Sequence, residues 1–155
     1  MPYDDSFYAR WRGPAISVIR VVVALAFMEH GTQKVLGFPP GGGGAPAAGL
    51  DLVAAYLELI GGALVAVGLL TRFTSFVLAG EMAVAYFMAH APHGFYPIAN
   101  KGELAVLYCF FFLFLFVEGA GSWSLDALLF KRAELKPPLE RESESDRSST
   151  HAYLK

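Results

Sequence analysis

Hydrophobic residues gather in four long stretches, at about residues 16–38, 50–70, 73–91 and 102–117. A helix needs about 20 apolar residues to cross the hydrocarbon core of a bilayer, with about 17–25 tolerated. The fourth stretch is short but is the most apolar. None of these stretches shows the alternation of apolar and polar residues that is typical of a β-barrel strand. Helices are the other structure that satisfies its backbone hydrogen bonds in lipid. The pattern predicts an all-α integral membrane protein, a bundle of four transmembrane helices.

Polar and glycine-rich segments separate these stretches. Residues 39–49 and 92–101 are loops by composition, and Thr71 with Arg72 is interpreted as a tight turn between the second and third helices. After Gly119, the sequence GAGSWSLDALLF predicts a break and then a short interfacial helix, with Ser124 as its N-cap and Asp126 in its first turn.

The chain is therefore divided into three parts: an N-terminus at 1–13, a membrane domain at 14–130, and a charged, Pro- and Ser-containing tail at 131–155 that is expected to be disordered. Basic residues in short segments mark the cytoplasmic side of a membrane protein. One side carries Arg10, Arg12, Arg72, Lys131, Arg132 and Lys136, whereas Lys101 is the clearest basic residue on the other. Both termini are predicted in the cytoplasm (N-in, C-in).

Composition supports lipid as the main solvent of this chain. Of 155 residues, 55% are hydrophobic and only 17% are charged, below the roughly 25% usual in soluble domains. The net charge of -2 argues against nucleic acid as a partner. The single cysteine, Cys109, lies in an apolar run without a neighbour that would activate its thiol, so it is expected to be inert.

The candidate site is built from ionisable residues inside the predicted helices, where unpaired charges are costly and usually face the bundle interior. At about 1.5 Å per residue, His30, Glu58 and Glu81 lie roughly 12, 12 and 15 Å from the outer ends of their helices. We therefore expect a polar pocket in the outer half of the bundle. Its further lining is predicted to include Arg20, Gln33, Lys34 and Glu103.

Other interpretations of these residues stay open. They could be internal salt bridges that fix helix register, Arg20 and Lys34 could snorkel to the interface, and Glu103 could lie among headgroups. A metal site is disfavoured because the candidate ligands show no recognised spacing. A bis-histidine haem is also disfavoured, because it would pair the deep His30 with the peripheral His90 or His93. We expect no intrinsic cofactor and no metal.

The same residues carry a resemblance to the DoxX family of small four-span membrane proteins. The matching segments are Arg20 with His30-Gly31-x-x-Lys34, ELIGG through GLLTR at 58–72, NKGELA at 100–105 and GAGSWSLD at 119–126. The chain departs from the family pattern at Glu29, in the glycine-rich loop and in the extended tail.

The resemblance implies a multi-pass protein of the bacterial inner membrane that works as an oxidoreductase subunit, since relatives include subunits of a thiosulfate:quinone oxidoreductase. By that analogy, His30 or Lys34 would hydrogen-bond a quinone carbonyl, and Glu58 or Glu81 would move the accompanying proton. No redox-cofactor motif occurs, so a partner enzyme would supply the redox centre. The alternatives are a membrane anchor or assembly protein for a partner enzyme, and a small proton-coupled transporter. Four short spans enclose little volume, which favours a homodimer or a complex.

Overall fold

The computed structural model describes residues 5–40 and 47–134, and the regular elements within them are all helical. In chain order these are α1 (Asp5–Leu36), α2 (Leu50–Tyr56), η1 (Leu57–Gly61), α3 (Gly62–Val67), α4 (Thr71–Ala85), η2 (Tyr86–His90), η3 (Ala91–His93), α5 (Pro97–Asn100), α6 (Glu103–Glu118) and α7 (Leu125–Glu134). The α2, η1 and α3 segments follow one another without a break and form one rod; α4, η2 and η3 form another. Both η1 and η2 have π-helical geometry.

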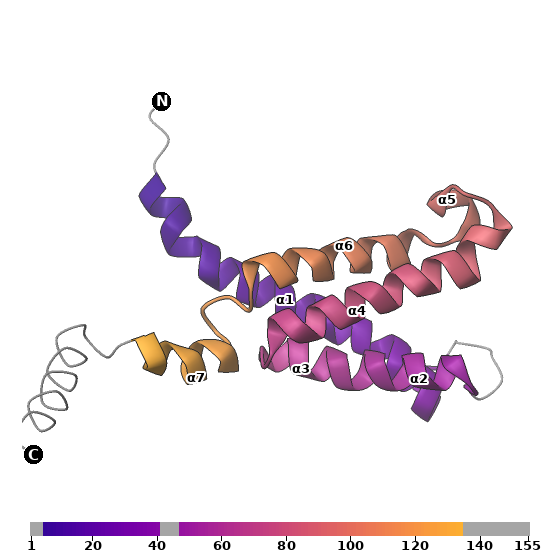
Figure 1. Ribbon diagram of the computed structural model, residues 1–155, viewed down its shortest axis with the longest axis horizontal. Helices are drawn as coiled ribbons and strands as arrows, with labels where there is room; N and C mark the ends of the chain where they lie inside the picture. The colour runs from indigo at the N-terminus through magenta and orange to yellow at the C-terminus, as the bar shows by residue number, and fades with distance from the viewer. Residues whose placement is uncertain (1–4, 41–46, 135–155) are drawn as a thin grey trace, which may run out of the picture.

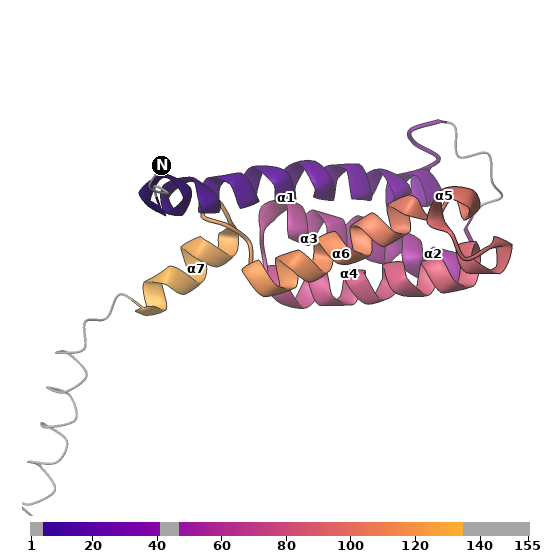
Figure 2. The same ribbon diagram turned by 90° about the horizontal axis from the view of Figure 1, so that it is seen from above.

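Four rods lie side by side (Figures 1 and 2): α1, the α2–α3 rod, the α4–η3 rod and α6. Helix α1 packs along the α2–α3 rod, and α4 packs along α6. The N-terminal turns of α1 and the whole of α7 project from the same end, here called the α7 end. The opposite end carries residues 37–40, 47–49 and 91–102 and is called the loop end.

Three of the rods are long and apolar enough to cross a membrane: Ser6–Leu36, Leu50–Val67 and Thr71–His93. Helix α6 is strongly apolar but has 16 residues, or about 24 Å of length. The all-helical prediction is thus confirmed for the described residues, while the count of four spans and the N-in, C-in orientation stay predictions. Helix α1 begins at Asp5, well before the predicted start of the first span, and the tail at 135–155 lies outside the described residues.

The predicted turn at Thr71 and Arg72 is wrong in position. The chain turns at Gly68–Leu70, where Gly68 (φ 71°) and Leu70 (φ 50°) adopt left-handed backbone conformations, and both predicted turn residues already belong to α4. The reason is Asp126 of α7, whose carboxylate accepts hydrogen bonds from the backbone N–H groups of Leu70 (2.8 Å) and Thr71 (2.9 Å). Because it satisfies donors that a helix start leaves unpaired, α4 begins earlier than its own sequence suggests.

The predicted start of α7 is confirmed. The Ser124 hydroxyl accepts a hydrogen bond from the backbone N–H of Ala127 at 3.1 Å, as an N-cap does. The backbone N–H of Asp126 in turn donates to the Gly68 carbonyl at 2.8 Å. The first turn of α7 is therefore fixed to the α3–α4 turn rather than free at the end of the bundle.

The bundle is apolar both inside and outside, as expected for a protein surrounded by lipid. Its core joins all four rods through Ala24, Phe27, Val65, Leu78, Ala79, Met82, Phe112 and Leu115. The outer surface exposes large apolar side chains along every rod, among them Val22, Ile60, Phe73 and Phe110. Polar side chains that are buried in such a bundle therefore lie away from bulk water.

Candidate functional site

An ion pair between two helices forms the centre of the candidate site. The Lys34 ammonium of α1 donates to Glu58 Oε1 of η1 at 2.6 Å. The Glu58 side chain is buried, whereas that of Lys34 keeps 37% of its surface exposed. The pair therefore connects the bundle interior to an accessible surface towards the loop end.

Backbone geometry places Glu58 directly against α1. Glu58 lies in the π-helical segment η1, and π turns of this kind are frequent at functional sites. A Cβ atom on Gly31 would meet the Ala55 carbonyl oxygen and the Leu59 nitrogen at 2.7 Å. Only glycine at position 31 allows this approach, so the His30-Gly31-x-x-Lys34 segment is needed for the shape of the site as well as its chemistry.

Glu81 of α4 is the third member of the cluster. It lies within electrostatic range of Glu58 and Lys34. Both of its carboxyl oxygens and Oε2 of Glu58 are buried without a hydrogen-bond partner in the described part of the chain. We call Lys34, Glu58 and Glu81 the acidic cluster. Among residues 5–40 and 47–134, Lys34 is the one cation found next to its two carboxyl groups.

His30 faces an aromatic wall rather than either carboxylate. Its ring lies edge-on to Tyr108 of α6 at 5.8 Å between centroids, and to Phe27 at 6.5 Å. Tyr108 in turn contacts Phe27 at 5.1 Å and Phe112 at 6.2 Å. The sequence interpretation did not include Tyr108, although a hydroxyl-bearing ring inside the apolar run of α6 was a signal that could have identified it.

Besides His30, three predicted site residues lie outside the acidic cluster. The Gln33 side-chain amide donates to the Pro39 carbonyl at 3.1 Å and holds the chain that leaves α1. Glu103 is exposed at the first position of α6. Arg20, the third, lies at the α7 end.

The Arg20 guanidinium is 1% exposed and is surrounded by backbone carbonyls. Its Nε donates to Ala120 at 2.8 Å, its Nη1 to Ala66 at 2.6 Å and also to Val65, and its Nη2 to Trp123 at 2.7 Å. It thereby joins α1, the end of α3 and the segment before α7. Four of its five N–H groups are thus used by the backbone, and a buried charge that is hydrogen-bonded at every nitrogen is a structural element.

The two peripheral histidines also bind the backbone. Nδ1 of His90 lies 3.1 Å from the Asn100 carbonyl oxygen, and Nδ1 of His93 lies 3.1 Å from that of Ala89. Asn100 is buried and donates to the Gly94 carbonyl at 2.6 Å. Within the described ranges, 5–40 and 47–134, no three His, Cys, Asp or Glu side chains are grouped so that they could hold a metal ion.

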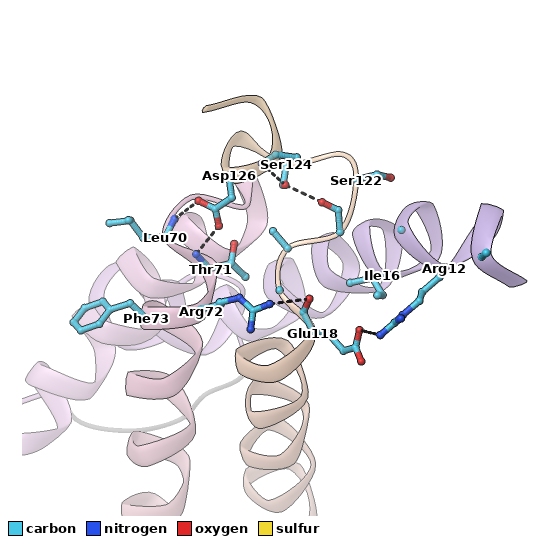
Figure 3. A pocket seen from close by; sticks show the side chains of 16 residues that line it. Arg12, Ile16, Leu70, Thr71, Arg72, Phe73, Glu118, Ser122, Ser124 and Asp126 are labelled. Atoms are coloured by element: carbon cyan, nitrogen blue, oxygen red, sulfur yellow. Dashed lines mark hydrogen bonds and ion pairs between the residues drawn. The ribbon is translucent and has the colours of Figure 1, made fainter. Parts of the chain in front are cut away.

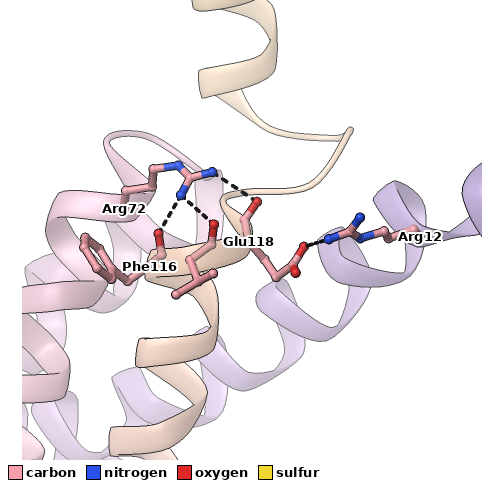
Figure 4. A network of polar contacts seen from close by, with 5 residues as sticks. Arg12, Arg72, Phe116 and Glu118 are labelled. Atoms are coloured by element: carbon pink, nitrogen blue, oxygen red, sulfur yellow. Dashed lines mark hydrogen bonds and ion pairs between the residues drawn. The ribbon is translucent and has the colours of Figure 1, made fainter.

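The α7 end contains a groove of about 770 Å³ between α1, α4 and the α6–α7 connection. Figure 3 shows Arg12, Thr71, Arg72, Glu118 and Asp126 around it. Arg72 donates to the carbonyls of Phe116 (2.7 Å) and Val117 (2.6 Å) at the end of α6, and Arg12 forms an ion pair with Glu118 (Figure 4). A groove of this size is within the range of ligand pockets.

Comparison with known proteins agrees with the sequence resemblance. The family model described as DoxX matches residues 15–91. An uncharacterized protein of Haemophilus influenzae is 45% identical over 129 residues, covering 79% of this chain and 96% of the relative. An uncharacterized membrane protein of Mycobacterium tuberculosis is 33% identical over 141 residues, covering 77% of this chain and 84% of the relative. No solved structure matches. On these matches and its long apolar helices, the chain belongs to the DoxX family of membrane proteins.

Proposed function

We propose that this protein is an oxidoreductase subunit of the bacterial inner membrane that crosses the bilayer four times with both termini in the cytoplasm. In this proposal the acidic cluster exchanges a proton with a quinone, and a partner protein supplies the redox centre. The observation that carries the proposal is the burial of Glu58 and of both Glu81 carboxyl oxygens near Lys34, between helices that face lipid.

Charge counting explains why such a cluster handles protons. Glu58 and Lys34 neutralise one another, so an ionised Glu81 would leave one negative charge without a partner in a medium of low dielectric. That arrangement costs several kcal/mol. One additional proton on either carboxyl group removes the imbalance. In this proposal the cluster therefore holds one extra proton. It releases this proton when a positive charge or a proton acceptor approaches the carboxyl groups.

The neighbouring side chains fit a quinone head group. The Lys34 ammonium has three N–H donors, of which Glu58 takes one. The rings of His30 and Tyr108 add a polar aromatic surface next to α1. A bound quinone would supply the electron-accepting group, while Lys34 or His30 would donate a hydrogen bond to its carbonyl and Glu58 or Glu81 would provide the proton.

The test compares two carboxylates that differ in burial. The full-length protein is purified from its membrane with its partners, its lipid extract is analysed for quinone, and quinone reduction is measured. Glu81→Gln should lower the rate by about tenfold or more, as loss of a proton-transfer group does. Glu103→Gln changes an exposed carboxylate at the start of α6 and is the matched control. A preparation without quinone, in which both variants reduce quinone at the wild-type rate, contradicts the proposal.

A further inference from the structure

Helix α1 has two opposite faces, and the rest of the described chain covers one of them. The covered face carries Ser17, Arg20, Ala24 and Phe27, each at most 1% exposed. Figure 2 shows α1 at one side of the bundle, so that the α2–α3 rod, the α4–η3 rod and α6 all lie on the same side of it. The opposite face of α1 is therefore open to a neighbour in the membrane.

The open face of α1 carries a seven-residue repeat. Its side chains follow one another at alternating spacings of four and three residues, which are the a and d positions of a heptad. In chain order they are Trp11, Ala15, Val18, Val22, Leu25, Glu29, Thr32 and Leu36, here called the outer stripe. Thr32 is half-buried and the others are exposed, the five large apolar ones by 51–69%. A repeat of this period, sustained along a helix, is typical of two helices that pack along one another.

One member of the outer stripe does not suit lipid. Glu29 is exposed, and within residues 5–40 and 47–134 its carboxylate forms no ion pair; Tyr108 lies within its electrostatic range. Glu29 precedes the last residue of α1, Leu36, by seven residues, or about 10 Å along the axis. Charged side chains inside a membrane span almost always face protein rather than acyl chains. The apolar members alone would fit lipid, so Glu29 is the residue that indicates a protein partner.

A second copy of this chain is the partner that fits the outer stripe. Copies inserted into one membrane have the same orientation, so their α1 helices run parallel and present the same repeat. Glu29 occupies an a position, and in a parallel pair of helices the same a position of each helix meets across the axis. A single polar residue at an a position among apolar ones is a pattern that fixes the register and the number of helices.

We propose that two copies of this chain pair α1 against α1 along the outer stripe, with the two Glu29 carboxyl groups hydrogen-bonded to one another between them. One proton shared by the two groups permits this contact, because two carboxylates at one site do not both stay ionised. Thr32 forms the next polar layer, and its hydroxyl already lies 3.1 Å from the Glu29 carbonyl oxygen. Gly31, which meets η1, belongs to the covered face. The pairing therefore does not depend on the quinone chemistry proposed for the acidic cluster.

Cysteine cross-linking locates the interface. The full-length protein with Cys109→Ser is purified and reconstituted alone in liposomes, where a second copy is the one protein that can cover the stripe, and is oxidised with copper phenanthroline. Val18→Cys and Leu25→Cys should each give a disulfide-linked dimer on a denaturing gel. Ile19→Cys is the matched control: Ile19 is as exposed as Val18, at 51%, but points about 100° away round the helix. Its two sulfurs should stay apart, since cysteines with Cα atoms more than about 7 Å apart are not bridged.

The role of Glu29 is measured by energy transfer between donor- and acceptor-labelled protein as the liposomes are diluted with lipid. Glu29→Leu should weaken pairing about five- to thirtyfold, the equivalent of the roughly 1–2 kcal/mol that a hydrogen bond between membrane helices contributes. Glu29→Gln keeps a side chain that donates and accepts, so it should pair as well as wild type. Glu103→Leu removes an exposed carboxylate at the start of α6 and should leave pairing unchanged.

Three results would overturn the inference. Energy transfer that stays at the level of random mixing shows that the protein is a monomer and that lipid or a different protein covers the outer stripe. Cross-linking at Ile19→Cys that equals cross-linking at Val18→Cys and Leu25→Cys shows that the copies meet by collision or through another face. Wild-type pairing of Glu29→Leu shows that the carboxyl groups do not meet.

Discussion

Arg20 and Glu81 are both ionisable side chains inside the bundle, but their surroundings differ. Every nitrogen of the Arg20 guanidinium donates to a backbone carbonyl, whereas both carboxyl oxygens of Glu81 are buried without a partner in the described residues. The first arrangement recovers the cost of burying a charge through hydrogen bonds. The second leaves part of that cost in place. Burial of a charge alone therefore does not indicate function; the informative feature is a buried charge that the fold leaves unsatisfied.

The largest effect that this comparison predicts is the loss of stability when Arg20 is replaced. Arg20→Ala removes the side-chain donor to the carbonyls of Ala66, Ala120 and Trp123, while the Val65 carbonyl keeps the Gly68 N–H. Each buried group without a partner costs about 1–3 kcal/mol, so the total should be several kcal/mol. We expect little folded protein, or a large drop in melting temperature measured by fluorescence-detected size exclusion.

Two variants sharpen this first prediction. Arg10→Ala removes an exposed arginine of the same helix and should leave the melting temperature near that of wild type. Glu81→Gln should be at least as stable as wild type, since it replaces a buried acid that has no partner. If Glu81→Gln destabilises the protein as strongly as Arg20→Ala does, the distinction between the two residues is wrong.

An intermediate effect is expected at Asp126, whose carboxylate caps α4 from another helix. Asp126→Ala removes both acceptors of the Leu70 and Thr71 N–H groups and should cost about 0.5–2 kcal/mol, the usual range for loss of an N-cap. Asp126→Asn keeps one acceptor and should recover part of this loss. Thermal unfolding in one detergent measures all three proteins. Equal stability of Asp126→Ala and wild type would show that the cap contributes nothing.

The smallest effect is expected at the Arg12–Glu118 pair beside the groove. The Arg12 side chain is 66% exposed, and exposed ion pairs contribute about 0.2–1 kcal/mol. Arg12→Gln should therefore lower the melting temperature only slightly, and high salt should reduce the difference further. A loss as large as that of Asp126→Ala would indicate that this pair is part of the structural network rather than a surface contact.

The sequence predicted the helices well because long apolar runs have few other solutions in lipid. It also predicted that His30, Glu58 and Glu81 would lie together at similar depth, since deep charges on neighbouring helices need one another. In the structure Lys34 pairs with Glu58, whereas the His30 ring packs against Tyr108 and Phe27. The sequence could not separate Arg20 from these residues, because the partners of Arg20 are backbone carbonyls that leave no trace in residue type. The turn before α4 was misplaced for a similar reason: its cap, Asp126, lies 56 residues from Leu70. Tyr108 was missed although its hydroxyl stands out in the apolar run of α6, because its contact with His30 depends on how the helices pack.

Helix α6 is about 6 Å shorter than a typical hydrocarbon core of about 30 Å. In the proposed four-span arrangement, the irregular segments next to α6 therefore lie close to acyl chains, or the bilayer thins around this helix. Those segments are where side chains bind the backbone: Asn100 accepts from the Gly102 N–H at 2.8 Å, and Arg72 binds the last carbonyls of α6. The two residues thus extend the reach of a helix that is too short, and thin membranes should suit this protein better than thick ones.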